Sequence, residues 1–352
     1  MSPLEQLGWG PFFDGQLTDE ERRALVPGRV LADLGPWLVV RYADQDRNTI
    51  VPGKIRGTAA APVVGDFVLA PPVPSPGVAR VLARRSRISR NVAGRQVGEQ
   101  VLAANVDVVF VVDALDALSG DMVRRIERSV AAVVAGGATP VVLLGKSDLA
   151  DELEPFLEAA RAAAPGVEVR AVSGKHGIGV DGLRAHLAAG RTAAFLGPSG
   201  AGKSTLVNAL LGEDVQVVGG VRERDGRGRH TTTTRRLFPL TGGGGVVDGP
   251  GIRELKLWDG GGLERTFEEV AEVAARCRFS DCAHGGEPGC AVRAALERGE
   301  LEEERVAGYL KLGAEAAAQA ARRAEPNRAE RKRWEKETTR ALRKLQKGRG
   351  DD

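Results

Sequence analysis

The sequence of 352 residues has few cysteines, few aromatic residues and no long apolar run. Its three cysteines are too few for a complete disulfide framework. No stretch approaches the roughly 18 consecutive apolar residues of a transmembrane helix, and the N-terminus MSPLEQLGWG lacks the basic segment of a secretory signal. The hydrophobic and charged contents, 42% and 28%, are ordinary for a globular protein. We therefore expect a cytoplasmic protein with no membrane contact.

Charge is almost balanced over the whole chain, with 50 basic and 47 acidic side chains, but it is unevenly distributed. Residues 28–95 carry 11 basic and 4 acidic side chains, and residues 321–352 carry 12 and 6. Residues 96–320 carry 25 basic and 32 acidic side chains. An acidic middle thus lies between two basic segments, and these segments are the candidates for contact with nucleic acid phosphates.

Residues 28–95 predict a small β-barrel of the OB type. Five short β-rich pieces follow one another between Gly, Pro, Asp and Asn residues: GRVLADL, PWLVVRYA, NTIVPGKI, APVVGDFVLA and GVARVLARRSRI. OB barrels commonly bind nucleic acid strands through basic grooves, so we interpret this segment as RNA-binding. The alternative is a plain barrel with a solvated basic rim. Residues 1–27 are interpreted as an N-terminal extension of unassigned role.

The segment 96–262 predicts a central α/β domain. Its Val-rich strand candidates are VDVVFVVDA, TPVVLLG, VEVRAV, TAAFLG and GGVVDG. Predicted helices alternate with them, at residues 121–135, 152–164, 181–189 and 203–211. Strands of this kind between helices indicate a parallel sheet covered on both faces. The remaining segment, 263–352, predicts a helical unit that ends in a long, solvated, basic helix from Ala314.

Residues 197–204 read GPSGAGKS and fit the phosphate-loop pattern G-x-x-x-x-G-K-[ST]. The apolar strand TAAFL leads into the loop and the helix STLVNALLG leads out, so backbone N–H groups and the helix N-terminus face the phosphates. Lys203 is expected to reach the β and γ phosphates, and Ser204 to bind Mg²⁺. The nucleotide-binding residues predicted here are Gly197, Pro198, Ser199, Gly200, Ala201, Gly202, Lys203, Ser204 and Thr205.

A second phosphate-facing motif, DGPG, ends the strand GGVVD. The carboxylate of Asp248 suits a Mg²⁺ ligand, usually through water, and the N–H of Gly251 can face a γ-phosphate. Between the two motifs, residues 226–236 read GRGRHTTTTRR. Their threonine hydroxyls, Thr232 and Thr233, are candidates for binding Mg²⁺ and sensing the γ-phosphate, so the segment is expected to order with nucleotide state. The alternative is a basic, solvated loop.

Two further motifs follow parallel strands upstream of the phosphate loop: GKSD at residues 145–148 and SGK at residues 173–175. With them, the chain resembles the RsgA (YjeQ) family of circularly permuted GTPases that depend on the small ribosomal subunit. The resemblance covers about residues 25–345 and includes the barrel, the GTPase domain and a zinc segment in that order. Ordinary GTPases have their phosphate motifs first, whereas here the base-reading motifs come first. The site survives such a permutation because loops at one sheet edge form it.

The resemblance implies which residues read the guanine base. Among them, Asp148 accepts hydrogen bonds from guanine N1 and N2. These residues are Lys146, Asp148, Ser173, Gly174 and Lys175. It also implies that Thr232 joins Ser204 and Asp248 around Mg²⁺.

The chain departs from the common GTPase motifs at two positions. Gly145 stands where N-K-x-D has Asn, so we expect guanine preference to be retained with weaker binding. Ile252 follows DGPG where Ras-like enzymes have a water-orienting Gln, which predicts slow intrinsic hydrolysis. His230 is a hypothetical catalytic replacement for that Gln, and the alternative is an ordinary histidine near the phosphates.

The cysteines share one 14-residue window with a histidine, as Cys277-x4-Cys282-x-His284-x5-Cys290. Three thiolates and one imidazole complete a tetrahedral Zn²⁺ shell without an open position, which is typical of a structural site. The resembling family has a zinc motif of the same spacing. Free buried cysteines are the alternative. We expect one zinc ion that supplies much of the folding energy of this small segment.

Together the motifs predict a multidomain GTPase that uses GTP, Mg²⁺ and one structural Zn²⁺. The resemblance implies a monomer that binds the 30S subunit and its 16S rRNA late in maturation, hydrolyses GTP when docked, and leaves. One alternative is a P-loop kinase or ATPase acting on a small substrate, which Asp148 opposes. Another is an RNA-binding scaffold that binds nucleotide without hydrolysing it, which Gly145 and Ile252 make conceivable.

Overall fold

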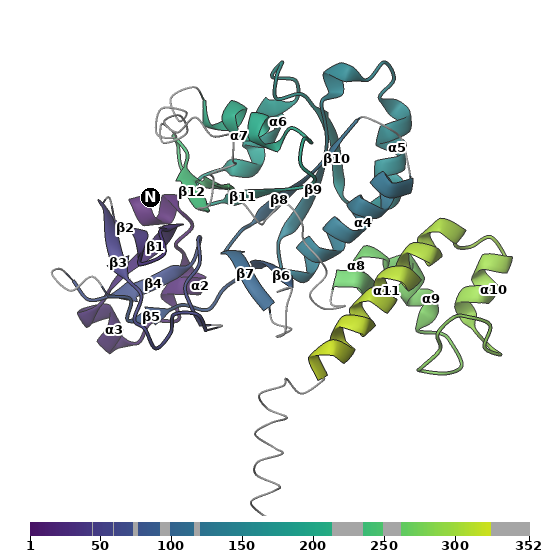
Figure 1. Cartoon of the computed structure of the whole chain (residues 1–352), viewed down its shortest axis with the longest axis horizontal. Coiled ribbons are helices and arrows are strands. Elements are labelled where there is room, and N and C mark those ends of the chain that lie inside the picture. Colours follow the sequence, from purple (N-terminus) through teal and green to yellow (C-terminus); the bar gives the residue numbers. More distant parts are fainter. Residues whose placement is uncertain are drawn as a thin grey trace, which may run out of the picture.

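The structure is a computed structural model of the whole chain. It describes residues 1–43, 45–58, 60–72, 77–91, 99–115, 120–212, 235–248 and 262–324. Over these ranges a barrel, a sheet domain and a helical unit follow one another along the chain (Figure 1). None of the helices in these ranges is long and apolar enough to cross a membrane. Several residues with predicted roles lie outside the described residues: His230, Thr232, Thr233, Gly251 and Ile252.

The barrel is closed, as the five β-rich pieces predicted. Its strands are β1 (Val26–Asp33), β2 (Trp37–Tyr42), β3 (Gln45–Ile50), β4 (Phe67–Ala70) and β5 (Arg80–Val81). Strand β1 pairs antiparallel with β2 and β4, while β2 pairs with β3 and β4 with β5. The circle closes where Ile50, at the end of β3, bridges to Gly77 just before β5. Alternate residues of β2, Leu38 and Val40 among them, fill the interior.

Three short helices precede the barrel and pack on it. They are α1 (Pro3–Gln6), α2 (Pro11–Asp14) and α3 (Asp19–Ala24). Phe13 of α2 is buried against Phe67 of β4, with ring centroids 4.2 Å apart. Strand β1 begins at Val26, inside the segment predicted as an extension. The N-terminal segment is therefore a packed cover of the barrel.

The sheet domain contains the five predicted parallel strands and one antiparallel strand. Its strands are β8 (Val108–Ala114), β9 (Thr139–Gly145), β10 (Glu168–Val172), β11 (Thr192–Leu196), β12 (Arg236–Pro239) and β13 (Gly245–Asp248). Their order is β10-β9-β8-β11-β13-β12, and only β12, which the sequence analysis did not predict, runs antiparallel. The parallel strands all end at the same edge, and four of the predicted motifs, GKSD, SGK, GPSGAGKS and DGPG, follow or end one of them.

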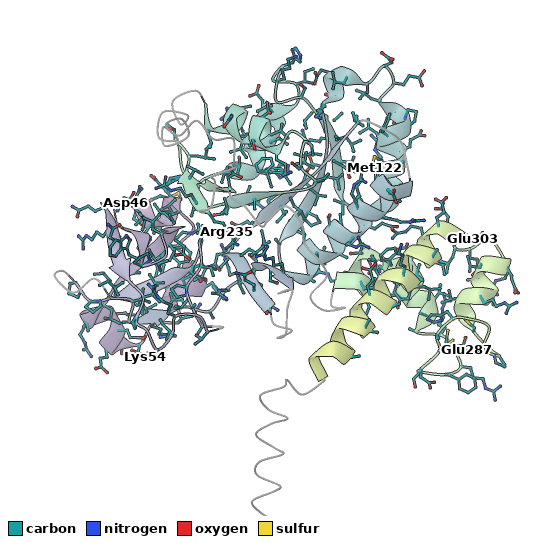
Figure 2. The ribbon with its side chains drawn as sticks, viewed as in Figure 1. Asp46, Lys54, Met122, Arg235, Glu287 and Glu303 are labelled. Atoms are coloured by element: carbon teal, nitrogen blue, oxygen red, sulfur yellow. The ribbon has the colours of Figure 1, made fainter. Side chains whose placement is uncertain are left out.

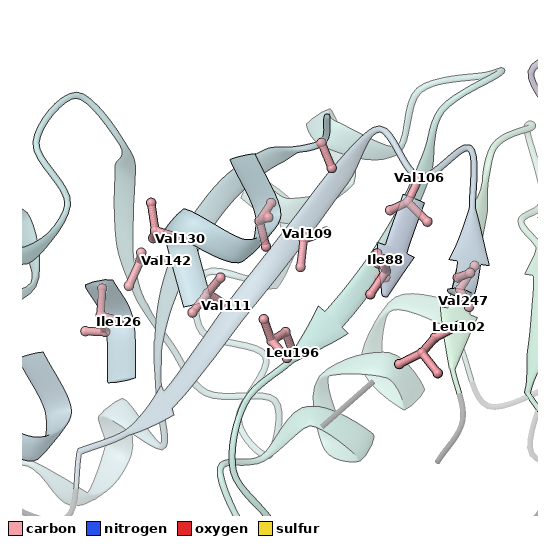
Figure 3. Packing of buried hydrophobic residues seen from close by; sticks show 14 of the residues in the cluster. Ile88, Leu102, Val106, Val109, Val111, Ile126, Val130, Val142, Leu196 and Val247 are labelled. Carbon is pink, nitrogen blue, oxygen red and sulfur yellow. The ribbon is translucent and has the colours of Figure 1, made fainter. Parts of the chain in front are cut away.

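Helices cover both faces of this sheet, as predicted. They are α4 (Gly120–Ala135), α5 (Glu154–Ala163), α6 (Val180–Arg184) and α7 (Lys203–Leu211), with short 3₁₀ turns η1 (Ser147–Leu149) and η2 (Ala185–Leu187). Strand β8 shows why both faces are needed, because its alternate residues point in opposite directions. Val109 and Val111 pack with Ile126 of α4, whereas Phe110 packs with Leu206 of α7. Figure 3 shows the first of these two layers.

A hairpin joins the barrel to the sheet domain. Its strands are β6 (Arg87–Asn91) and β7 (Glu99–Ala104). Ile88 and Leu102 belong to the same buried cluster as Val109 and Val247 (Figure 3), so the hairpin packs into the core of the sheet domain. The predicted domain boundary between residues 95 and 96 falls between its two strands. We propose that the sheet domain begins at β6.

The C-terminal unit is helical. Its helices are α8 (Leu263–Thr266), α9 (Glu268–Ala274), α10 (Ala291–Glu297) and α11 (Glu303–Ala324). They pack around the fully buried Phe267. The expectation of a solvated helix from Ala314 misplaced its start, because α11 begins at Glu303 and buries Val306 and Leu312 in this core. Residues 325–352, the rest of the predicted basic helix, lie outside the described residues.

Candidate functional site

The phosphate loop joins β11 to α7, and its glycines adopt backbone conformations that side chains disfavour. Gly197, Gly200 and Gly202 have φ values of 144°, 83° and 95°. A Cβ atom on Gly197 would collide with the carbonyl oxygen of Val112 at the end of β8. The loop therefore passes directly over the sheet edge, where only glycine fits.

Lys203, the first residue of α7, directs its ammonium group into this loop. The residue is 9% exposed, and Nζ donates a hydrogen bond of 2.8 Å to the carbonyl oxygen of Gly197 and another to that of Pro198. Ser204 and Thr205 follow on the exposed first turn of the helix. The positive charge thus lies inside the loop, and the exposed Ser204 follows it in the first turn of α7.

The two base-reading loops touch the phosphate loop through glycines. A Cβ atom on Gly145 would lie 2.5 Å from the carbonyl oxygen of Ala201. A Cβ atom on Gly174 would lie 2.9 Å from the backbone nitrogen of Leu206 and 2.9 Å from the carbonyl carbon of Thr205. Gly145 removes the contact that Asn makes with the base in N-K-x-D motifs. It also has a structural role, because it lets the end of β9 pack on the phosphate loop.

Asp148 and Ser173 come from the ends of neighbouring strands and meet at this edge. The hydrogen bond from the Ser173 side chain, with help from the charges of His176 and Lys175, lowers the pKa of the Asp148 carboxyl below 3.8. Ser173 is buried, and the stem of Lys146 lies 4.0 Å from the Cβ position of Gly202. Asp148 is therefore ionised at neutral pH and can accept from two donors on one base edge.

His176 is a residue that the sequence analysis did not single out. Its Nε2 lies 3.6 Å from Oδ2 of Asp148, and about half of its side chain is exposed. The sequence feature that could have identified His176 is its position directly after the SGK motif.

Asp248 ends β13 at the same edge. Strand β13 pairs with β11 as far as Val247 opposite Ala194, so Asp248 stands beside the last residues before the phosphate loop. A carboxylate here and the hydroxyl of Ser204 are the hard oxygen donors that Mg²⁺ prefers. Of the predicted phosphate-site residues, those at 230–233 and Gly251 lie outside the described part of the chain.

The predicted zinc ligands converge in the helical unit. One ligand atom from each of Cys277, Cys282, His284 and Cys290 lies within 4.8 Å of the others. Nδ1 of His284 is 3.6 Å from Sγ of Cys277 and from Sγ of Cys290. Metal–ligand bonds of about 2.0–2.3 Å in a tetrahedron separate the ligands by roughly 3.6 Å. The donor set and its spacing therefore fit Zn²⁺.

Backbone donors prepare two of the thiols for a metal. The N–H of Ala291 donates to Sγ of Cys277 at 3.3 Å, and the N–H of Arg293 donates to Sγ of Cys290 at 3.4 Å. Burial acts to raise the pKa of Cys277, but the N–H groups of Val292 and Ala291 outweigh it and the pKa is lowered. Such donors favour the thiolate form, which is the form that binds a metal.

Glu287 organises the loop that carries His284 (Figure 2). Its carboxylate accepts hydrogen bonds from the N–H groups of Ala283, Gly285 and Gly286, at 3.0, 2.9 and 3.1 Å. His284 itself has a φ of 59°, a conformation that few residues other than glycine adopt without support. The carboxylate thus holds the ligand loop in shape.

The chain is similar to known proteins over most of its length. The family model described as RsgA GTPase matches residues 81–258. A small ribosomal subunit biogenesis GTPase, RsgA, of Streptomyces avermitilis is 43% identical over 316 residues, which are 88% of this chain and 85% of that protein.

Two solved structures are also similar. YjeQ from Thermotoga maritima has a TM-score of 0.62 and 27% identity, and the match covers 83% of this chain and 99% of that chain. YloQ, described as a circularly permuted GTPase, has a TM-score of 0.58 and 22% identity, over 86% of this chain and 99% of that chain. The second likeness bears on the fold alone, and it agrees with a phosphate loop that follows the base-reading motifs.

Proposed function

This chain belongs to the RsgA GTPase family, and we propose that it hydrolyses GTP during biogenesis of the small ribosomal subunit, with that subunit as its partner. The observation that carries the proposal is the convergence of three motif loops at one sheet edge. Gly145 and Gly174 let the base-reading loops pack on the phosphate loop and on the first turn of α7. Such an edge is where open α/β sheets bind nucleotides.

We assign the roles at this edge as follows. Lys203 and the N–H groups of the phosphate loop bind the β and γ phosphates, and Asp148 accepts from the guanine base. Ser204 and Asp248 hold Mg²⁺, which neutralises charge that develops on the phosphates. The threonines at 232 and 233, with His230, are proposed to complete the site around the γ-phosphate.

The two segments with predicted roles at the γ-phosphate, the threonine-rich segment and the segment after Asp248, lead along the chain to β12 and to the zinc-binding unit. Strand β12 begins at Arg236, the last residue of the threonine-rich segment, and pairs with barrel strand β1, with Arg236 opposite Ala32. Helix α8 begins after the segment that follows Asp248, and Gly262 before it packs on the backbone of Ala131 in α4. Changes around the γ-phosphate can therefore reach both the barrel and the zinc unit.

Contact with the subunit is proposed to involve both of these units. Asp46 and Lys54 lie on the barrel and Glu287 and Glu303 on the helical unit, at opposite sides of the sheet domain (Figure 2). Residues 28–86, which include the barrel strands, carry eight basic and four acidic side chains. The barrel is proposed to bind 16S rRNA, with affinity that falls as salt rises. The protein is proposed to act in the cytoplasm as a monomer with one structural zinc.

The test is GTP turnover by the purified protein with and without purified small subunits. We expect slow turnover alone and faster turnover with subunits. Both should be lost in Lys203→Ala and kept in the control Arg161→Ala, which removes an exposed positive charge from α5 of the sheet domain. ATP turnover at the same rate would favour the kinase or ATPase alternative. GTP binding without turnover in either condition would favour the scaffold alternative. One zinc per chain, lost in Cys282→Ala, is the expected metal content.

A further inference from the structure

The loop that carries the SGK motif is closed on itself and presents His176 to Asp148. The N–H of Ser173 donates to the carbonyl oxygen of Ile178 at 3.0 Å, and the N–H of His176 donates to Oγ of Ser173 at 3.3 Å. Gly177, with a φ of 72°, turns the chain directly after the histidine. These hydrogen bonds fix the backbone from which the imidazole of His176 extends.

Asp148 is approached from this loop by three polar side chains. Ser173 donates a hydrogen bond to its carboxylate, Lys175 adds positive charge, and the imidazole of His176 faces it. Nε2 of His176 is 3.6 Å from Oδ2, and the Asp148 side chain is only 14% exposed. Lys146, directed toward Gly202 of the phosphate loop, is the further charged group on the element of Asp148 itself.

A carboxylate has about four lone-pair sites, so it can accept more donors than guanine supplies. Guanine N1 and N2 would occupy one site on each oxygen. A further site on Oδ2 faces His176. Both kinds of donor can therefore bind Asp148 at the same time.

We propose that His176 is a positioning residue for guanine specificity, which restrains the Asp148 carboxylate so that it accepts from N1 and N2 together. The proposal rests on the proposed function, because it concerns the base-reading half of the same site. It also explains how specificity is kept with Gly145, since no amide side chain at that position can brace the base-reading loop. His176 restrains the Asp148 carboxylate and so compensates in part for the missing amide side chain.

The test compares guanine with hypoxanthine, which lacks the N2 amino group. Dissociation constants for GDP, IDP and ADP are measured on the full-length protein by displacement of a fluorescent GDP. The variants are His176→Ala, His176→Gln and the control His186→Gln. His186 is matched because its Nε2 also faces a carboxylate, 3.2 Å from Oε2 of Glu168, in the same domain.

We expect His176→Ala to reduce the preference for GDP over IDP by roughly tenfold. This is the scale of losing one hydrogen bond to a charged group, here the bond from guanine N2 to the Asp148 carboxylate. His176→Gln, which keeps a side-chain N–H donor, is expected to restore much of the preference, and His186→Gln to leave it unchanged. An unchanged ratio in His176→Ala, or equal weakening of GDP and IDP, would overturn the proposal. Equal binding of ADP and GDP by the unaltered protein would instead overturn the proposed function.

Discussion

Arg305 of α11 donates a hydrogen bond of 3.1 Å from Nη1 to Oε1 of Glu127 on α4, and both side chains are buried. The same guanidinium donates from Nε to Glu269 at 2.8 Å and to the carbonyl oxygens of Thr266 and Ala163. These partners belong to α8, α9, α4 and α5. One side chain therefore fastens the zinc-binding unit to the GTPase domain.

Arg305→Met should lower the free energy of unfolding by about 3–5 kcal/mol, because it leaves Glu127 buried without its partner. Urea unfolding measures the change. The double variant Arg305→Met with Glu127→Met should recover a large part of the loss, since no buried charge then remains unpaired. Arg298→Met is the control, because Arg298 pairs with Glu300 at the exposed surface. Simple additivity of the two single losses would contradict this account.

The same pair predicts how stability depends on pH. Burial raises the pKa of the Glu127 carboxyl above 4.5, although the charge of Arg305 opposes the rise. A carboxyl with a raised folded-state pKa contributes stability below its unfolded pKa and loses it as pH rises through the folded pKa. Arg305→Met removes the opposing charge, so the pKa should rise further.

The stability difference between Arg305→Met and the unaltered protein should consequently be larger at about pH 7.5 than at about pH 5. Urea unfolding at both values measures it. Glu127→Gln in the Arg305→Met background is the control, and its pH dependence should disappear. A difference that stays constant with pH would show that Glu127 does not carry the effect.

Local patterns in the sequence were enough for most of the fold and for the motif loops. The Val-rich strands β8 and β9 were predictable because β-branched runs between helices have few other structures open to them. The phosphate loop and the zinc ligands were predictable because their chemistry fixes the spacing of residues within one short segment. Residues 197–204 and the window from Cys277 to Cys290 are of this kind.

Local sequence patterns could not predict contacts between segments that are far apart in the chain. Arg305 and Glu127 are 178 residues apart, and each alone looks like a solvated charge on a helix. Strand β12 was missed because its short sequence RLFP gains its structure from pairing with β13 and with β1 of the barrel. His176 was missed because its partner, Asp148, lies on the preceding strand's loop.

Glu287→Ala should weaken zinc binding roughly 10–100-fold, the range found when groups that orient metal ligands are removed. The variant loses the acceptor for three N–H groups around His284. Transfer of zinc to a chromogenic chelator measures the affinity without reference to GTP turnover. Glu287→Gln keeps one carbonyl acceptor, so its zinc affinity should lie between those of Glu287→Ala and the unaltered protein.

The matched control for this experiment is Glu297→Ala. Glu297 is an exposed residue of α10, and its ion pair is with Arg293 of the same helix. Its removal should leave zinc affinity unchanged. Equal zinc affinities in Glu287→Ala and Glu297→Ala would mean that the ligand loop holds its shape without the carboxylate.

Gly145→Asn restores the common N-K-x-D motif, yet it should weaken GDP binding. A Cβ atom at this position would lie 2.5 Å from the carbonyl oxygen of Ala201 and 3.3 Å from Cγ1 of Val112, and backbone cannot yield as a flexible side chain does. The phosphate loop must then shift, and we expect a loss of about tenfold or more in affinity, since small misplacements of binding groups are costly. Gly145→Ala should lose a similar amount, because the Cβ atom alone causes the collision. Gly53→Ala is the control, as its Cβ position in the barrel has open space around it. Fluorescent GDP titration measures all three, and tighter binding by Gly145→Asn would show that the missing amide contact outweighs the packing of the two loops.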